Sequence, residues 1–305
     1  MSKGVWAGLF AYAIWGFFPI YFHALSGVPA EQTTAHRVVW SFLFISIVIL
    51  VRKEIGSFTH SLDWKKVGIY LLAGTMLAAN WGTYVWAVGN GRVVEASLGY
   101  FINPVVSVLM GVVFLREKLR SLQWVVVGLA VFGVGLLTYS YGQVPWISLA
   151  LAFTFGMYGF IKKLAPLGTL HGLALETMMI FVPALVLLLT AEFSGKGAFG
   201  HISSWTTILL AFTGIVTAVP LFLFSYGAKN IPLSTLGLLQ YVTPTLQFLL
   251  GIFMFKEVFT ISHLSGFIVI WLALIIFTVD SFIFYRRSSL RQRAAAAARE
   301  ISDIA

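Results

Sequence analysis

The chain contains ten apolar runs that are each long enough to cross a lipid bilayer. A transmembrane helix needs about 20 apolar residues for roughly 30 Å of hydrocarbon, which is about twice the length of a barrel strand. Lipid-exposed backbone must satisfy its own hydrogen bonds, so we interpret the runs as helices. They are Gly4–Leu25, Thr33–Val51, Val67–Val88, Val93–Leu115, Leu122–Tyr141, Val144–Ile161, His171–Ala191, Trp205–Tyr226, Leu233–Phe255 and Ile261–Phe284.

The composition fits no water-soluble class. Hydrophobic residues make up 59% and charged residues 10% of the chain, with a mean hydropathy of +0.91; soluble domains carry about 25% charged residues. The sequence therefore predicts an all-α polytopic membrane protein and excludes a soluble enzyme. The first run exceeds the roughly 7–15 residues of a signal-peptide core, so we expect an uncleaved helix. With no cysteine, disulfides and thiolate metal sites are excluded.

Basic residues predict the orientation. With the N-terminus inside, ten spans place sixteen of the twenty Lys and Arg residues at the inner face and leave four outside, namely Arg37, Arg92, Lys196 and Lys256. This bias follows the positive-inside rule. We expect both termini in the cytoplasm, with residues 286–305 as a basic cytoplasmic tail. Because the charges are spread over short loops, no nucleic-acid partner is expected.

An internal repeat has a constant offset of 140 residues. The stretch 103–117 matches 243–257, with Pro, Gly and Glu at the same spacing, and the offset holds without a gap across five helices. We therefore predict a first repeat at 1–142 and a second at 143–285. Five is an odd number, so the second repeat must insert upside down. Two inverted five-helix repeats are typical of secondary transporters, whose solute site lies near the midplane between them.

The Pro–Gly–Glu signature that closes the fourth helix of each repeat resembles the EamA branch of the drug/metabolite transporter superfamily. The opening segment Gly4–Tyr21, the stretch His36–Ser41 and the stretch Asn80–Ala87 add to the resemblance. It covers Met1 to about Arg287. The resemblance implies a permease of a bacterial inner (plasma) membrane that exports small organic metabolites or drugs, and it implies no cofactor.

Polar groups inside a bilayer are costly and are candidates for function. Arg37 is expected to attract an anionic part of a solute, and Glu176 to bind a cation or a proton, with His36 as a second proton-coupling candidate. Alternatively, these three side chains extend to the membrane interfaces and orient their helices. The complete predicted solute pathway is His36, Arg37, Asn80, Tyr84, Tyr100, Asn103, Glu176, Gln240 and Gln247.

A second set of residues is expected to act in packing, gating or at helix ends. Small residues allow close helix approach, and proline frees a carbonyl in the helix; this set is Gly16, Pro104, Gly111, Gly156, Pro244 and Gly251. Glu117 and Glu257 follow their helices and are expected to accept unpaired N–H groups of the turn into the next helix, or to pair with Lys118 or Lys256. Asp280 is expected to pair with a basic tail residue such as Arg286.

Other functional classes receive less support. The chain has no phosphate-binding loop of the GxxxxGK[ST] type and no HExxH metal site, and the polar stretch Arg52–Lys66 is too short for a catalytic domain. No metal or cofactor is predicted; the predicted partners are the lipid bilayer and a small organic solute, and no oligomeric state follows. An uncoupled facilitator, a non-transporting regulator and a lipid-modifying membrane enzyme remain alternatives, although the six histidines show no cluster in the sequence.

Overall fold

The computed structural model describes residues 2–90, 92–141, 144–255, 268–269, 271–277, 279–280 and 283, and every regular element in this part is a helix. The helices are α1 (Lys3–Gly16), α2 (Phe18–His23), α3 (Ala30–Val51), α4 (Ile55–His60), α5 (Trp64–Gly89), α6 (Val93–Val113), α7 (Ser121–Tyr141), α8 (Trp146–Leu164), α9 (Thr169–Phe193), α10 (Ser204–Asn230), α11 (Leu233–Leu239) and α12 (Val242–Phe253).

Seven predicted runs each form one helix, and two runs are interrupted. The first run divides into α1 and α2 two residues before Pro19, whose ring clashes with the carbonyl four residues earlier and which has no N–H to donate. The ninth run divides into α11 and α12 before Pro244, whereas its counterpart Pro104 lies inside a continuous α6. The tenth run, Ile261–Phe284, lies largely outside the described residues. The short helix α4 was not predicted.

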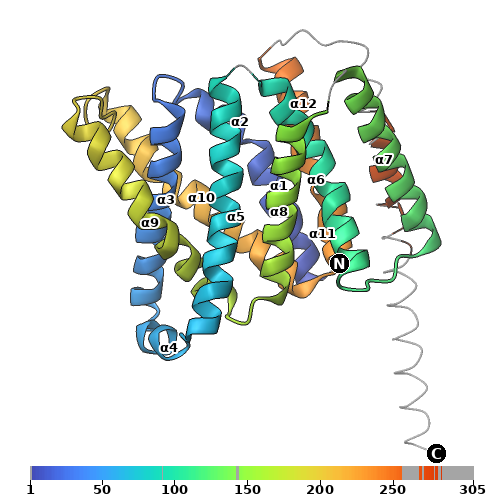
Figure 1. The fold of residues 1–305 in the computed structure, drawn as a ribbon, viewed down its shortest axis with the longest axis horizontal. Helices are drawn as coiled ribbons and strands as arrows, with labels where there is room; N and C mark the ends of the chain where they lie inside the picture. The colour runs from blue at the N-terminus through green and yellow to red at the C-terminus, as the bar shows by residue number, and fades with distance from the viewer. Residues whose placement is uncertain are drawn as a thin grey trace, which may run out of the picture.

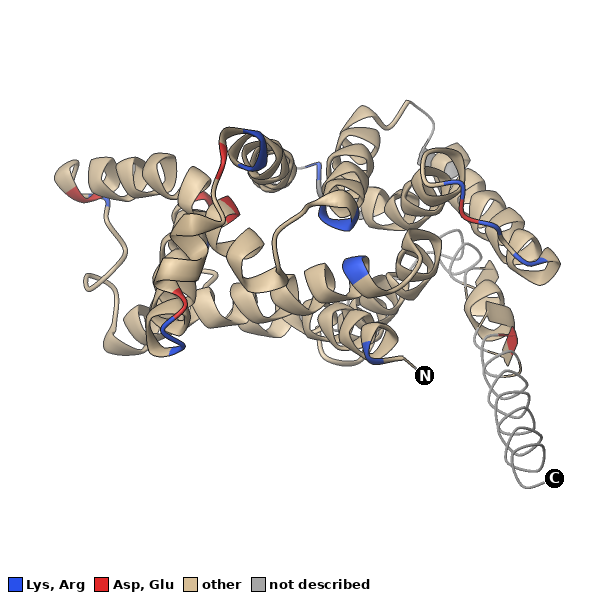
Figure 2. Ribbon diagram, turned by 90° about the horizontal axis from the view of Figure 1, so that it is seen from below, with Lys and Arg blue, Asp and Glu red and all other residues tan. Residues whose placement is uncertain are grey.

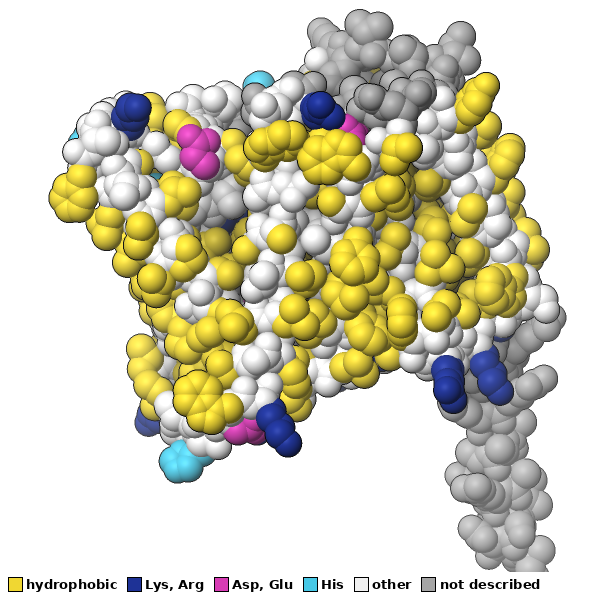
Figure 3. All heavy atoms as spheres, in the orientation of Figure 1, with side chains coloured by type: hydrophobic (Ala, Val, Ile, Leu, Met, Phe, Trp, Pro, Cys, Tyr) yellow, Lys and Arg dark blue, Asp and Glu magenta, His cyan; other side chains and the backbone are white. Residues whose placement is uncertain are grey.

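The outer surface of the bundle is apolar. Six segments in the described part are long and apolar enough to cross a membrane, and two shorter helical segments, Leu98–Val113 and Ser121–Leu136, are also apolar. Figure 3 shows hydrophobic side chains over the middle of one face, with charged side chains gathered at its two ends. An apolar band between charged ends is the surface that a bilayer requires. The chain is a multi-pass membrane protein.

Close helix contacts recur at the offset of 140. A Cβ atom placed on Gly16 would lie 2.7 Å from Leu246 Cβ, and one placed on Gly156 would lie 2.8 Å from Val106 Cγ1. Gly156 is Gly16 plus 140, and Leu246 is Val106 plus 140, so the first contact becomes the second when the halves are exchanged. Figure 1 shows α1 and α8, which carry these glycines, running in opposite directions.

Two further contacts join residues to their own counterparts. The rings of Trp15 and Phe155 lie 5.7 Å apart between centroids, and the Tyr241 hydroxyl donates a hydrogen bond to the Phe101 carbonyl at 3.2 Å. In each pair the residue numbers differ by 140. Both contacts therefore join residues that occupy equivalent positions in the internal repeat of the sequence.

Candidate solute cavity and inner closure

A cavity of about 450 Å³ lies between the two halves of the bundle. It reaches the connection between α2 and α3, where Leu25, Ser26 and Val28 contribute to its wall. Seven of the nine predicted pathway residues line it, from α3, α5, α6, α12 and the α11–α12 break: Arg37, Asn80, Tyr84, Tyr100, Asn103, Gln240 and Gln247. Spacing along separate helices therefore identified side chains that the fold brings together.

Arg37 is the only charged residue in the described lining of this cavity. Its Nε donates to Thr217 Oγ1 at 3.0 Å. Its guanidinium carbon lies 4.3 Å from the ring centroid of Trp81, 5.2 Å from that of Phe22 and 5.6 Å from that of Phe18. No ion pair in the described part of the chain includes it. An aromatic cage holds this cation without neutralising it.

Amides and aromatic rings supply the other functional groups of the cavity. Asn80 Nδ2 donates to the Leu151 carbonyl at 2.9 Å and to Thr154 Oγ1 at 3.0 Å. Gln240 Oε1 is buried and has no hydrogen-bond partner among the described residues. A buried acceptor of this kind requires a donor from water or a ligand. The cavity therefore offers one cation, hydrogen-bonding amides and flat apolar surfaces.

His36 does not line the cavity. It is buried on another side of α3, with its ring 5.3 Å from that of Phe199. Adjacent helix positions differ by about 100°, so a side chain next to Arg37 faces different neighbours. This placement differs from the predicted pathway.

Glu176 also lies outside the cavity lining and is held in a buried ion pair. Its Oε1 is 2.6 Å from Lys162 Nζ, and both side chains are 0% exposed. Its Oε2 accepts a hydrogen bond from the Tyr158 hydroxyl at 3.1 Å. The cation that Glu176 binds is thus a residue of the chain itself. Lys162 was expected at the inner face, but α8 extends to Leu164 and brings it inside the bundle.

Two more lysines tie segments together near this pair. Lys229 Nζ donates to the carbonyls of Ala165 and Leu167 at 2.5 and 2.6 Å, and Lys163 Nζ donates to the Ile231 carbonyl at 2.5 Å. Figure 2, seen from the end at which α1 begins, shows basic segments near the middle of the bundle as well as at its edge. We refer to Tyr158, Lys162, Glu176 and Lys229 as the inner closure, a name that follows the predicted orientation and the closing role proposed below.

The carboxylates at helix ends bind partners that lie far away in the sequence. Glu117 accepts hydrogen bonds from the backbone N–H groups of Leu233 and Ser234 at 2.6 and 2.8 Å, and from the Ser234 hydroxyl at 2.6 Å. It therefore caps α11 rather than the next helix in the chain. Asp280 pairs with Arg120 at 2.5 Å, and its expected partner Arg286 lies outside the described residues.

The remaining predicted positions show close packing or lie outside the description. A Cβ atom on Gly111 would lie 2.6 Å from Glu117 Oε2, which explains why no larger residue fits beside that cap. Gly251 is buried within α12. Glu257 lies outside the described residues. No group of three potential metal-ligating side chains occurs in the described part of the chain.

A helical bundle with an apolar exterior and a polar, aromatic cavity between its two halves has the architecture of a membrane transporter. The EamA-like transporter family matches residues 2–139 and again residues 144–279. The chain belongs to this family.

Known relatives agree with this assignment. Protein RarD of Streptomyces exfoliatus is 44% identical over 294 residues, covering 96% of this chain and 93% of that protein. The uncharacterized transporter YojE of Bacillus subtilis is 44% identical, covering 94% and 97%, and Protein RarD of Escherichia coli is 38% identical, covering 94% and 97%. A crystal structure with 19% sequence identity superposes with a TM-score of 0.69 over 91% of this chain and 98% of that one, which shows a shared fold.

Proposed function

We propose that this protein is a secondary transporter of small organic solutes that carry an anionic group. The observation that carries the proposal is Arg37, a cation without a described carboxylate partner in the wall of the central cavity. A charge held inside the bundle, away from bulk water, is costly unless something compensates it, and a bound anion would do so. The aromatic rings around the guanidinium suit an amphipathic or aromatic solute.

We further propose ten spans arranged as two inverted five-helix repeats, at 1–142 and 143–285, with both termini in the cytoplasm. Support comes from the two family matches, at 2–139 and 144–279, and from contacts such as Trp15 with Phe155 that join equivalent residues. Because the relatives named above come from bacteria, the proposed location is the bacterial inner membrane.

Transport would proceed by alternating access, with the inner closure shut in the present conformation. The cavity reaches the α2–α3 connection, while the Lys162–Glu176 pair lies outside its lining. At the offset of 140, the counterparts of Lys162 and Glu176 are Phe22 and His36. An outer closure formed by these counterparts would contain no such ion pair. The conformation closed at the inner end is therefore expected to be the more stable one.

A second candidate is an uncoupled facilitator. Among the described residues, no carboxylate or histidine lines the cavity, and the two predicted proton-coupling residues both lie outside it. Proton coupling through Glu176 would have to act by opening its ion pair with Lys162. Equal transport with and without a proton gradient would favour the facilitator.

The direction we propose is export, as the family resemblance implies, and no enzymatic activity is proposed. One relative, 27% identical over 95% of this chain, is named chloramphenicol-sensitive protein RarD of Pseudomonas aeruginosa. Aromatic drugs and metabolites are therefore reasonable first ligands to test against the cavity.

The experiment is a thermal-shift screen of purified protein in liposomes, using aromatic acids and their neutral amides as matched pairs. We expect stabilisation by acids over amides for the wild type and for the control Lys196→Gln, which lies outside the cavity lining, and loss of that preference for Arg37→Gln. Ligands found in this way enter flux assays on right-side-out and inverted vesicles. Equal stabilisation by acids and amides would contradict the anion proposal.

A further inference from the structure

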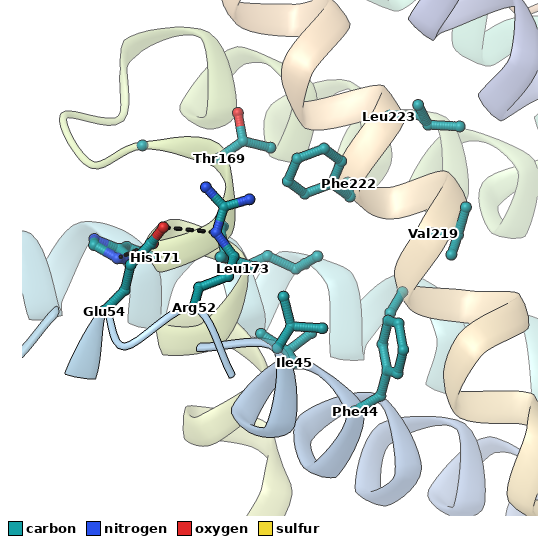
Figure 4. A pocket seen from close by; sticks show the side chains of 14 residues that line it. Phe44, Ile45, Arg52, Glu54, Thr169, His171, Leu173, Val219, Phe222 and Leu223 are labelled. Carbon is teal, nitrogen blue, oxygen red and sulfur yellow. Dashed lines mark hydrogen bonds and ion pairs between the residues drawn. The ribbon is translucent and has the colours of Figure 1, made fainter. Parts of the chain in front are cut away.

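A second hollow, of about 520 Å³, lies between α3, α9 and α10. Its body is apolar, with Ile45 from α3, Leu173 from α9 and Phe222 from α10 among its walls. Polar groups occur at one end only, where Arg52, Glu54, Thr169 and His171 meet (Figure 4). The hollow is thus amphipathic along its length.

This hollow faces the membrane rather than the solute cavity. Val219 and Phe222 contribute to its wall and are each 37% exposed, so they present apolar surface to lipid. Leu221 of the same helix is 2% exposed and lines the solute cavity instead. The two spaces therefore lie on different sides of α10.

At the polar end, part of the Arg52 guanidinium remains free to bind an anion. Glu54 Oε1 accepts from Arg52 Nε at 2.6 Å, and Glu54 Oε2 lies 3.1 Å from His171 Nε2, so both carboxylate oxygens are engaged. The hydrogen bond from Arg52 lowers the pKa of Glu54, so the carboxylate stays charged and fixes the guanidinium. In Figure 4 the two terminal nitrogens of Arg52 point away from Glu54 toward Thr169.

The surroundings of this end are also positive. Helix α9 begins at Thr169 with neither a side-chain cap nor an acidic residue in its first turn, so its first N–H groups carry uncompensated positive charge. The neighbouring segment contains Lys53, Lys65 and Lys66, of which Lys66 pairs with Asp63 at 3.0 Å. At the opposite end of the bundle, the counterparts of Arg52 and His171 are Glu192 and Glu31. The two positions that are equivalent in the repeat are therefore acidic rather than basic.

We propose that this hollow binds an anionic phospholipid from the leaflet at the α4 end, with one acyl chain between α3 and α10 and the phosphate at Arg52 and Thr169. An acyl chain complements the apolar body, and a phosphodiester complements a guanidinium edge next to a hydroxyl and a helix N-terminus. The bound lipid would brace the inner halves of α3, α9 and α10 against one another.

The test is native mass spectrometry of the full chain in detergent, titrated with phosphatidylglycerol or with phosphatidylcholine of the same acyl chains. Arg52→Gln removes the headgroup contact and is matched by Lys65→Gln on the same face. Val219→Trp fills the hollow and is matched by Val186→Trp, which replaces another lipid-exposed valine. As a control, the unfolding transition of each variant is measured without added lipid, so that a variant that fails to fold is recognised.

We expect one phosphatidylglycerol to bind the wild type and both control variants about tenfold more tightly than Arg52→Gln or Val219→Trp. Phosphatidylcholine should bind the wild type about as weakly as phosphatidylglycerol binds Arg52→Gln. Equal affinity for the two lipids, or equal affinity of Arg52→Gln and the wild type, would overturn the proposal. Displacement of the lipid by inorganic phosphate would show a free-phosphate site and would also overturn it.

Discussion

Arg37 and Lys162 are both cations inside an apolar bundle, but their surroundings differ completely. Lys162 forms an ion pair with Glu176 that is 0% exposed on both sides, whereas Arg37 meets aromatic rings and one hydroxyl in the wall of a cavity. A compensated charge stabilises one arrangement of the helices, and an uncompensated one is available to a ligand. The comparison supports the proposal that Lys162 holds the inner end shut and that Arg37 recognises the solute.

The largest effect is expected for breaking the buried pair. Glu176→Gln leaves Lys162 charged without its counterion, and removing one partner of a buried pair costs about 3–5 kcal/mol. Reversible unfolding in mixed micelles should show this loss in the free energy of unfolding. A loss below about 1 kcal/mol, the value typical of exposed pairs, would contradict the buried pair.

Replacing both charges tests whether the cost comes from the uncompensated ion. The double variant Lys162→Met with Glu176→Leu fills a similar volume without charge, and such replacements are often neutral or stabilising. We expect unfolding close to that of the wild type. The inner closure should then open more readily, which labels attached across it would detect.

Arg37→Gln should have the opposite signature. We expect its free energy of unfolding to stay within about 1 kcal/mol of the wild type, because no ion pair is broken. Affinity for an anionic ligand should fall about tenfold or more, since hydrogen bonds to charged groups contribute about 1.5–3 kcal/mol. Thermal shifts with and without ligand separate the two quantities, and a large loss without ligand would show that Arg37 is structural.

A smaller effect is expected for the ring under the guanidinium. Trp81→Leu removes a cation–π contact worth about 0.5–2 kcal/mol. Ligand affinity should fall by severalfold, and Trp86→Leu, on the same helix but outside the described cavity lining, serves as the control. If both variants lost ligand affinity to the same extent, the loss would be due to altered packing rather than to the cation–π contact.

The smallest effect concerns Glu54 at the membrane surface, whose pKa is lowered mainly by the hydrogen bond from Arg52. A lowered carboxylate pKa stabilises the fold above the unfolded-state pKa, and this contribution is lost as the pH falls through the folded-state value. Acidification should therefore loosen residues 52–60 relative to α9, as read by hydrogen exchange. In Glu54→Gln this pH dependence should disappear.

Most of the predicted pathway residues lie together in one cavity, whereas the ion pair of the inner closure was not predicted. The difference has a physical reason. Pathway residues such as Tyr100 and Asn103 repeat at helical spacing on apolar helices, and that spacing is visible in the chain. Lys162 lay beyond the predicted end of its run at Ile161, so the ion pair depended on one additional turn of α8. The unused signal in the sequence was Glu176 inside one apolar run and Lys162, 14 residues earlier, directly after the end of the preceding run.

Other differences have a similar origin in tertiary contacts. Both Pro104 and Pro244 lie in matching sequence surroundings, but only the second interrupts its helix, and no local rule separates them. Glu117 was expected to accept hydrogen bonds at the start of the next helix. The N–H groups that donate to it belong instead to α11, more than 110 residues away. Helix positions follow from local periodicity, whereas the choice of partner depends on which ends meet in space.

The contact between Trp15 and Phe155 has a kinematic consequence. In the proposed exchange of the two halves, a contact between equivalent residues is transformed into itself, while every contact away from the axis is transformed into a different one. The two rings, 5.7 Å apart, would thus form a pivot contact that is kept in both conformations of the proposed cycle. A covalent cross-link between positions 15 and 155 should therefore leave transport unaffected. The same cross-link between positions 162 and 176 should stop transport.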